Sequence, residues 1–153
     1  MTNSDVIQPA FPHLAASTDG AASQPRRLRS VGAVVAGLVA IFAVTTGVDA
    51  VMHATGVFPP VGAPPMSDSL FLLAFAYRFV IDVAGCWLCA RLAPRRPMRH
   101  ALMLGAIGTV LSIAGAVAMW DASRAWYPLA LAASSLPSAW LGARLEQRRA
   151  RVA

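Results

Sequence analysis

The chain has 153 residues, of which 57% are hydrophobic and 13% charged, and its mean hydropathy is +0.57. This composition is too apolar for an ordinary soluble domain of that length and indicates a membrane protein. The net charge is +6, but all 13 basic residues are arginines grouped beside apolar segments. That pattern is typical of membrane topology rather than of nucleic-acid binding. We therefore expect the lipid bilayer to be the partner, and no nucleic acid.

The first half of the chain predicts a tail and two membrane helices. Residues 1–27 lack sustained apolar periodicity, which predicts a disordered cytoplasmic tail. Residues 31–54 follow as an apolar segment, long enough at about 1.5 Å per residue to cross a hydrocarbon core of about 30 Å. The four prolines of the loop 56–67 exclude a helix there, and residues 70–92 form the next apolar segment.

The second half predicts two further helices joined by short turns. The third covers about residues 100–120, and the fourth covers 126–143, near the lower length limit for a span. The last residues, 146–153, are basic and predict a solvated cytoplasmic tail. Because short turns join antiparallel neighbours, the prediction is an all-α fold, a four-transmembrane-helix antiparallel bundle over residues 28–145.

The arginines predict the orientation of this bundle. Eleven of them flank the same ends of the four segments, whereas only Arg124 flanks the opposite ends. The eleven are Arg26, Arg27, Arg29, Arg91, Arg95, Arg96, Arg99, Arg144, Arg148, Arg149 and Arg151. Because cytoplasmic loops retain basic residues, both termini are predicted to be cytoplasmic in a bacterial inner membrane. A cleaved signal peptide fits less well, because the first apolar segment is longer than the apolar region of such a signal.

Aromatic residues agree with this orientation. Phe58, Trp120, Trp126 and Tyr127 are expected at the outer interface, and Trp87 and Trp140 near the inner one.

Four polar residues within the apolar segments are the candidate site: Asp49, His53, Arg78 and Asp82. A charge at the centre of a bilayer costs roughly 2.5 to 3.5 kcal/mol, so each charge needs an explanation. Counted along the helices, Asp49 lies roughly 9 Å from the outer edge, Arg78 roughly 12 Å and Asp82 roughly 18 Å. The similar depths predict an ion pair between Asp49 and Arg78, with Asp82 as a second possible partner of the arginine.

Two interpretations of this cluster remain open. One is a neutralised ion pair that fixes the register of two helices, and the other is a proton or ion relay or a small polar cavity open to the outside. His53 and Asp49 are too few ligands for a metal within one chain.

Cys86 and Cys89 form a C-x-x-C pattern, but the chain has no second pair to complete a zinc site. Small packing residues are therefore the better interpretation of these cysteines. The sequence also contains no phosphate-binding, acyl-nucleophile or zincin motif. We expect neither an enzyme nor a bound cofactor or metal.

Small residues recur every four positions in the third and fourth segments, which predicts that these helices pack closely. The series are Ala101, Gly105, Thr109; Gly108, Ser112, Ala116; and Ala130, Ser134, Ser138, Gly142.

Several stretches resemble a group of small, uncharacterised bacterial four-helix integral membrane proteins. They are residues 47–60 (GVDAVMHATGVFPP), 66–68 (MSD), 76–78 (AYR), 90–94 (ARLAP) and 137–142 (PSAWLG). The resemblance covers residues 28–145 and implies the class of protein but no activity.

These observations predict a structural or accessory subunit of the inner membrane, associated with itself or with another membrane protein. The alternative is a small oligomeric transporter or channel-like protein with a polar path through Asp49, Arg78 and Asp82.

Overall fold

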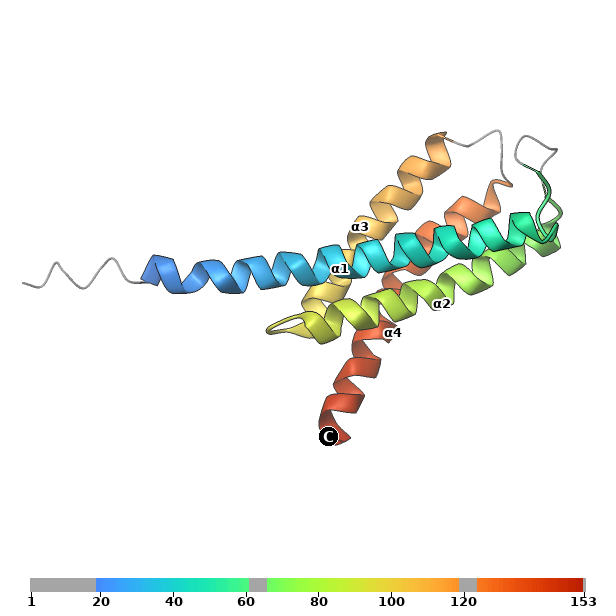
Figure 1. Ribbon diagram of the computed structural model, residues 1–153. Coiled ribbons are helices and arrows are strands. Elements are labelled where there is room, and N and C mark those ends of the chain that lie inside the picture. Colours follow the sequence, from blue (N-terminus) through green and yellow to red (C-terminus); the bar gives the residue numbers. More distant parts are fainter. Residues whose placement is uncertain (1–18, 61–65, 119–123, 153) are drawn as a thin grey trace, which may run out of the picture.

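The computed structural model describes residues 19–60, 66–118 and 124–152, with the side chains of α1 described from Leu28 onward. These residues form helices joined by short turns, and no strand occurs among them. The helices are α1 (Asp19–Ala54), α2 (Asp68–Leu92), α3 (Pro97–Ala118) and α4 (Trp126–Val152) (Figure 1). The all-α prediction is confirmed.

Two predicted boundaries are wrong, because helices extend where tails were expected. α1 begins at Asp19, so residues 19–27 are helical rather than disordered, and α4 continues through the predicted basic tail to Val152. Adding a residue to an existing helix costs little, and the extension of α4 is rich in good helix formers such as alanine, glutamate and arginine. Figure 1 shows the first turns of α1 projecting beyond the rest of the bundle.

The helices pack as a bundle with α2 at its centre. α2 contacts α1, α3 and α4, while α3 also packs extensively against α4 (Figure 1). The turn between α2 and α3 spans only residues 93–96, so these two helices are antiparallel neighbours, as predicted.

Two apolar clusters mark the two ends of the bundle. At the end flanked by most arginines, Cys86, Cys89, Ala90, Ala101, Leu104, Ala139 and Ala143 form one buried cluster. At the opposite end, Phe58, Phe71, Ala74 and Tyr127 form another. Phe58 and Tyr127, which the sequence predicted at an interface, lie at this end of the bundle and are buried there. Burial of a large ring against other rings removes more apolar area than an interface position would.

Glycines set the closest helix contacts. A Cβ atom on Gly105 of α3 would lie 2.6 Å from the Cβ of Ala139 on α4, and one on Gly142 of α4 would lie 2.6 Å from the backbone nitrogen of Trp87 on α2. The predicted close packing of the third and fourth helices is confirmed. The absence of a side chain at Gly142 lets α4 approach the backbone of α2 directly, as the absence of one at Gly105 lets α3 approach α4.

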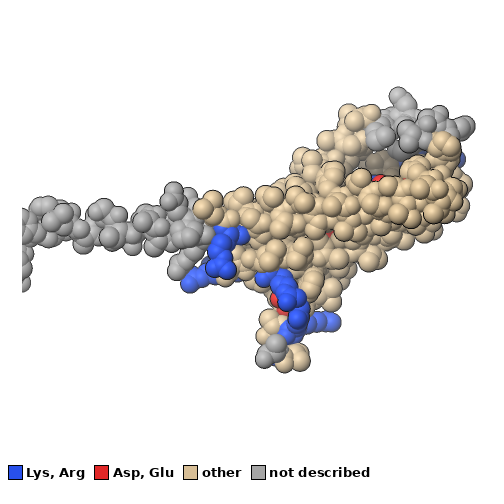
Figure 2. Space-filling view, in the orientation of Figure 1, with Lys and Arg blue, Asp and Glu red and all other residues tan. Residues whose placement is uncertain are grey.

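The surface of the bundle is that of a membrane protein. Large apolar side chains are widely exposed, including Phe42 at 61%, Val80 at 66% and Val110 at 66%. A soluble monomeric protein rarely exposes so much apolar surface, because its contact with water is unfavourable. Among the described helices, three are long and apolar enough to cross a membrane, namely Leu28–Ala54 of α1, α2 and α3. In Figure 2 the arginines gather where α1 enters the bundle and along the end of α4.

Candidate functional site

The polar cluster of the bundle is built around the carboxylate of Asp49. Asp49 lies on α1, five residues before its last residue, Ala54, at a level where α2 presents two consecutive polar side chains. Arg78 Nη2 donates to Asp49 Oδ2 at 2.5 Å, and the hydroxyl of Tyr77 donates to Asp49 Oδ1. The predicted ion pair across α1 and α2 is confirmed. Both carboxylate oxygens have a donor from the neighbouring helix.

Asp82 does not share this arrangement as a direct partner. It is half-buried one turn further along α2, and no hydrogen bond joins it to Arg78. The Nε of Arg78 is buried and has no hydrogen-bond partner within the described part of the chain. Arg78 therefore retains one unused donor in a region that also contains a second carboxylate.

His53 belongs to the rim of the site. It is exposed, one turn beyond Asp49, and its ring meets that of Phe58 edge-on with centroids 5.6 Å apart. Gly56 has a φ of +73°, a left-handed conformation that ends α1 and folds the chain back, so that Phe58 N donates to Met52 O at 3.0 Å. Phe58 in turn lies 6.5 Å from the ring of Tyr77. The rings of His53, Phe58 and Tyr77 thus form an aromatic cluster beside the Asp49 contact.

A second polar contact joins the N-terminal ends of α2 and α4. Asp68 Oδ1 accepts a hydrogen bond from Trp126 Nε1 at 3.2 Å and lies 3.5 Å from Arg124 Nε. The side chains of Asp68 and Arg124 are 65% and 56% exposed, so this is a surface contact. It resembles the Asp49 cluster in composition but differs from it in burial.

The cysteines lie apart from the polar cluster. Cys86 and Cys89 are free thiols buried among small residues at the other end of the bundle. The described residues include no group of three or more histidine, cysteine or acidic side chains placed to hold a metal ion.

Tyr77 is the site residue that the sequence did not reveal. Its position next to Arg78 was a signal, because adjacent residues on a helix point about 100° apart and both can reach one partner on a neighbouring helix. A tyrosine is common in membrane helices as an interfacial anchor, however, so its role as a donor became evident only from the tertiary contact.

No family model, curated protein sequence or solved structure matches this chain.

Proposed function

We propose that the chain is a four-span protein of the bacterial inner membrane, with α4 as the fourth span. α4 is less apolar than the other helices because its last turns contain four arginines and Glu146, and its central turns contain Ser134, Ser135 and Ser138. These serines are buried, and their hydroxyls donate to carbonyls of α4 itself, at Leu131 O or Ser135 O. Polar groups that are satisfied within their own helix and covered by neighbouring helices are compatible with a membrane span.

The proposed orientation has both termini in the cytoplasm, and the arginine distribution supports it. The arginines that follow α2, precede α3 and end α4 flank the end of the bundle where α1 also enters. Retention of basic residues on the cytoplasmic side is the main determinant of membrane topology.

The function we propose is that of a non-enzymatic structural or accessory subunit. The observation that supports this role is that both oxygens of the Asp49 carboxylate accept a hydrogen bond from a side chain of α2. A carboxylate that is paired in this way holds α1 and α2 in one register. It is not free to bind and release a proton or an ion along a transport path. Such a rigid helix pair suits a component that binds another membrane protein or a second copy of itself.

The second candidate is a small oligomeric transporter or channel-like protein that uses Asp49, Arg78 and Asp82. The unpartnered Nε of Arg78 and the nearby carboxylate of Asp82 are the observations that favour it. A bundle of this size would need other copies to complete a path, because transporters build their sites between repeated helical units.

Reporter fusions test the topology. Fusions after residues 62 and 122 should report the periplasm, and fusions after residues 96 and 150 the cytoplasm. A periplasmic signal at residue 96 would overturn the proposed arrangement.

Native mass measurements and proton flux then separate the two functions. An accessory subunit should purify from mild detergent in a fixed ratio with a partner or with itself, and proteoliposomes containing it should leak protons no faster than empty liposomes. A flux that disappears in Asp82→Asn would favour the transporter. A strict monomer without partner or flux would contradict both functions.

A further inference from the structure

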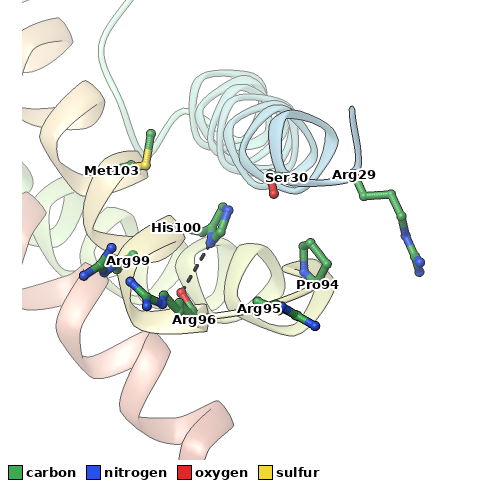
Figure 3. Close-up of a pocket in the computed structure, with 8 residues that line it drawn as sticks. All are labelled: Arg29, Ser30, Pro94, Arg95, Arg96, Arg99, His100 and Met103. Carbon is green, nitrogen blue, oxygen red and sulfur yellow. Dashed lines mark hydrogen bonds between the residues drawn. The ribbon is translucent and has the colours of Figure 1, made fainter. Parts of the chain in front are cut away.

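A basic pocket opens at the end of the bundle opposite the Asp49 cluster. Its volume is about 520 Å³, within the range of small-ligand sites. Three segments line it: the start of the apolar part of α1, the turn between α2 and α3, and the first two turns of α3 (Figure 3). The lining residues are Arg29, Ser30, Pro94, Arg95, Arg96, Arg99, His100 and Met103.

Backbone geometry positions the arginines of this pocket. Arg96 has a φ of +52°, a left-handed conformation that is unusual for a residue other than glycine. In this conformation its carbonyl accepts hydrogen bonds from Arg99 N at 2.9 Å and from His100 Nδ1 at 3.3 Å. Figure 3 shows Arg29 and Arg95 on one side of the His100 ring and Arg96 and Arg99 on the other. Four arginines from three segments therefore line one opening.

These four charges have no counter-charge in the described part of the chain. No described carboxylate lies within ion-pair distance of Arg29, Arg95, Arg96 or Arg99. Other arginines at this end are partnered differently, since Arg91 and Arg149 lie over the ring of Trp87 and Arg144 over that of Trp140. The electrostatic potential of the pocket thus favours a bound anion.

The pocket also stands at the level where the membrane surface would be. Arg29 and Ser30 immediately precede the long apolar run of α1 that begins at Val31, and Met103 forms part of the wall on α3. Val31 is 62% exposed and Met103 57% exposed. An anion bound here would have apolar helix surface directly beside it, on the side of the bilayer.

We propose that this pocket binds the phosphate headgroup of an anionic phospholipid, with its acyl chains lying along the exposed apolar surface of α1 and α3. Arginine guanidinium groups bind phosphate oxygens in a bidentate manner, and basic pockets between membrane helices recognise such headgroups. The adjoining apolar surface favours a lipid over free phosphate, which would gain only the charge contacts. The inference rests on the proposed insertion in a membrane, but not on a subunit or transporter role.

Lipid retention by the purified full-length protein tests the proposal. Native mass spectrometry would compare phosphatidylglycerol with phosphatidylcholine of the same acyl chains, each added to the protein in detergent. The unaltered protein should retain phosphatidylglycerol in preference. Arg96→Gln with Arg99→Gln should lower that retention about tenfold or more, since each arginine near a lipid surface contributes about fivefold in affinity.

A matched control removes the same charge outside the pocket. Arg148 and Arg151 are exposed on α4 beyond the pocket, so Arg148→Gln with Arg151→Gln should leave retention nearly unchanged. Equal losses in the two double variants would overturn the proposal, as would equal retention of the two lipids. Displacement of the lipid by millimolar inorganic phosphate would show a site for free phosphate instead.

Two further measurements keep the outcome interpretable. If the glutamine variant does not fold, Arg96→Lys with Arg99→Lys keeps the charges, and high salt applied to the unaltered protein should release phosphatidylglycerol selectively. Resistance of the chain to alkaline carbonate extraction tests membrane insertion separately. An inserted chain that does not distinguish the two lipids would refute the pocket assignment and leave the membrane topology standing.

Discussion

The contact between α1 and α2 and the contact of α4 with α2 hold the bundle together by different physical means. The first includes a charged contact near the last turns of α1, where Asp49 meets Tyr77 and Arg78, in addition to close packing at Gly37 and Gly85. The second has no charge at its centre and depends on Gly142, which brings α4 against the backbone of α2. In a bilayer, where lipid tails are as apolar as the helices, ion pairs and close packing are the two ways in which a specific helix contact is stabilised.

The two contacts should therefore respond differently to substitution. The polar contact fixes the register of α1 and α2 through charge. A smaller side chain should therefore destabilise it less than the removal of one partner, which leaves the other charge unpaired. The small-residue contact should tolerate changes of charge nearby but not one added methyl group. Substitutions at Arg78, Gly142, Tyr77 and Asp68 test this difference, because each removes or obstructs one of these contacts.

Arg78→Ala should have the largest effect. It removes the partner of Asp49 and leaves two carboxylates, Asp49 and Asp82, in an apolar setting, which should lower the free energy of unfolding by about 3 kcal/mol. Thermal unfolding in detergent measures this. Asp49→Asn combined with Arg78→Gln should recover part of the loss, because neither charge then needs a partner. An Arg78→Ala protein as stable as the unaltered one would show that the ion pair does not hold α1 to α2.

Gly142→Ala should come next. The added Cβ would lie 2.6 Å from Trp87 N and 2.7 Å from Val83 O, backbone atoms that cannot move aside as a flexible side chain can. We expect a loss of about 2 kcal/mol by overpacking, measured by the same unfolding assay. Gly47→Ala is the matched control, because nothing lies within 4 Å of its Cβ position, and it should be neutral or slightly stabilising. Equal effects at the two glycines would refute the packing argument.

Tyr77→Phe should cost less, about 1.5 kcal/mol, because it removes one hydrogen bond to a charged group but leaves the ion pair. Tyr127→Phe provides a comparison, since the hydroxyl of Tyr127 makes no hydrogen bond among the described residues. If the two substitutions destabilise the protein equally, the bond from Tyr77 to Asp49 has no energetic role of its own.

Asp68→Asn should have the smallest effect, about 0.5 kcal/mol, because its ion pair with Arg124 is largely exposed and screened. Unfolding at low and high salt checks this, since the difference between the variant and the unaltered protein should shrink as salt is added. A loss as large as that of Arg78→Ala would mean that burial does not distinguish the two ion pairs.

The pairing of Asp49 with Arg78 was predictable because helical rise converts sequence position into depth, and the two residues have similar depths on consecutive helices. The engagement of Tyr77 was not, because it depends on how α1 and α2 are rotated about their axes. The same rotation leaves His53 on the exposed rim and Asp82 without a hydrogen bond to Arg78. The basic pocket was also hidden, since its arginines were visible in the sequence only as topology signals.

The sequence by itself determined the class of protein, the position of the apolar segments and the side on which arginines accumulate, because each depends only on composition along the chain. It misjudged the helix ends at Asp19 and Val152, where helix continuation costs less than the polar composition implied. Tertiary structure alone decided which face of each helix is turned inward. That choice depends on contacts between residues far apart in sequence, such as Gly142 with Trp87 and Asp49 with Tyr77.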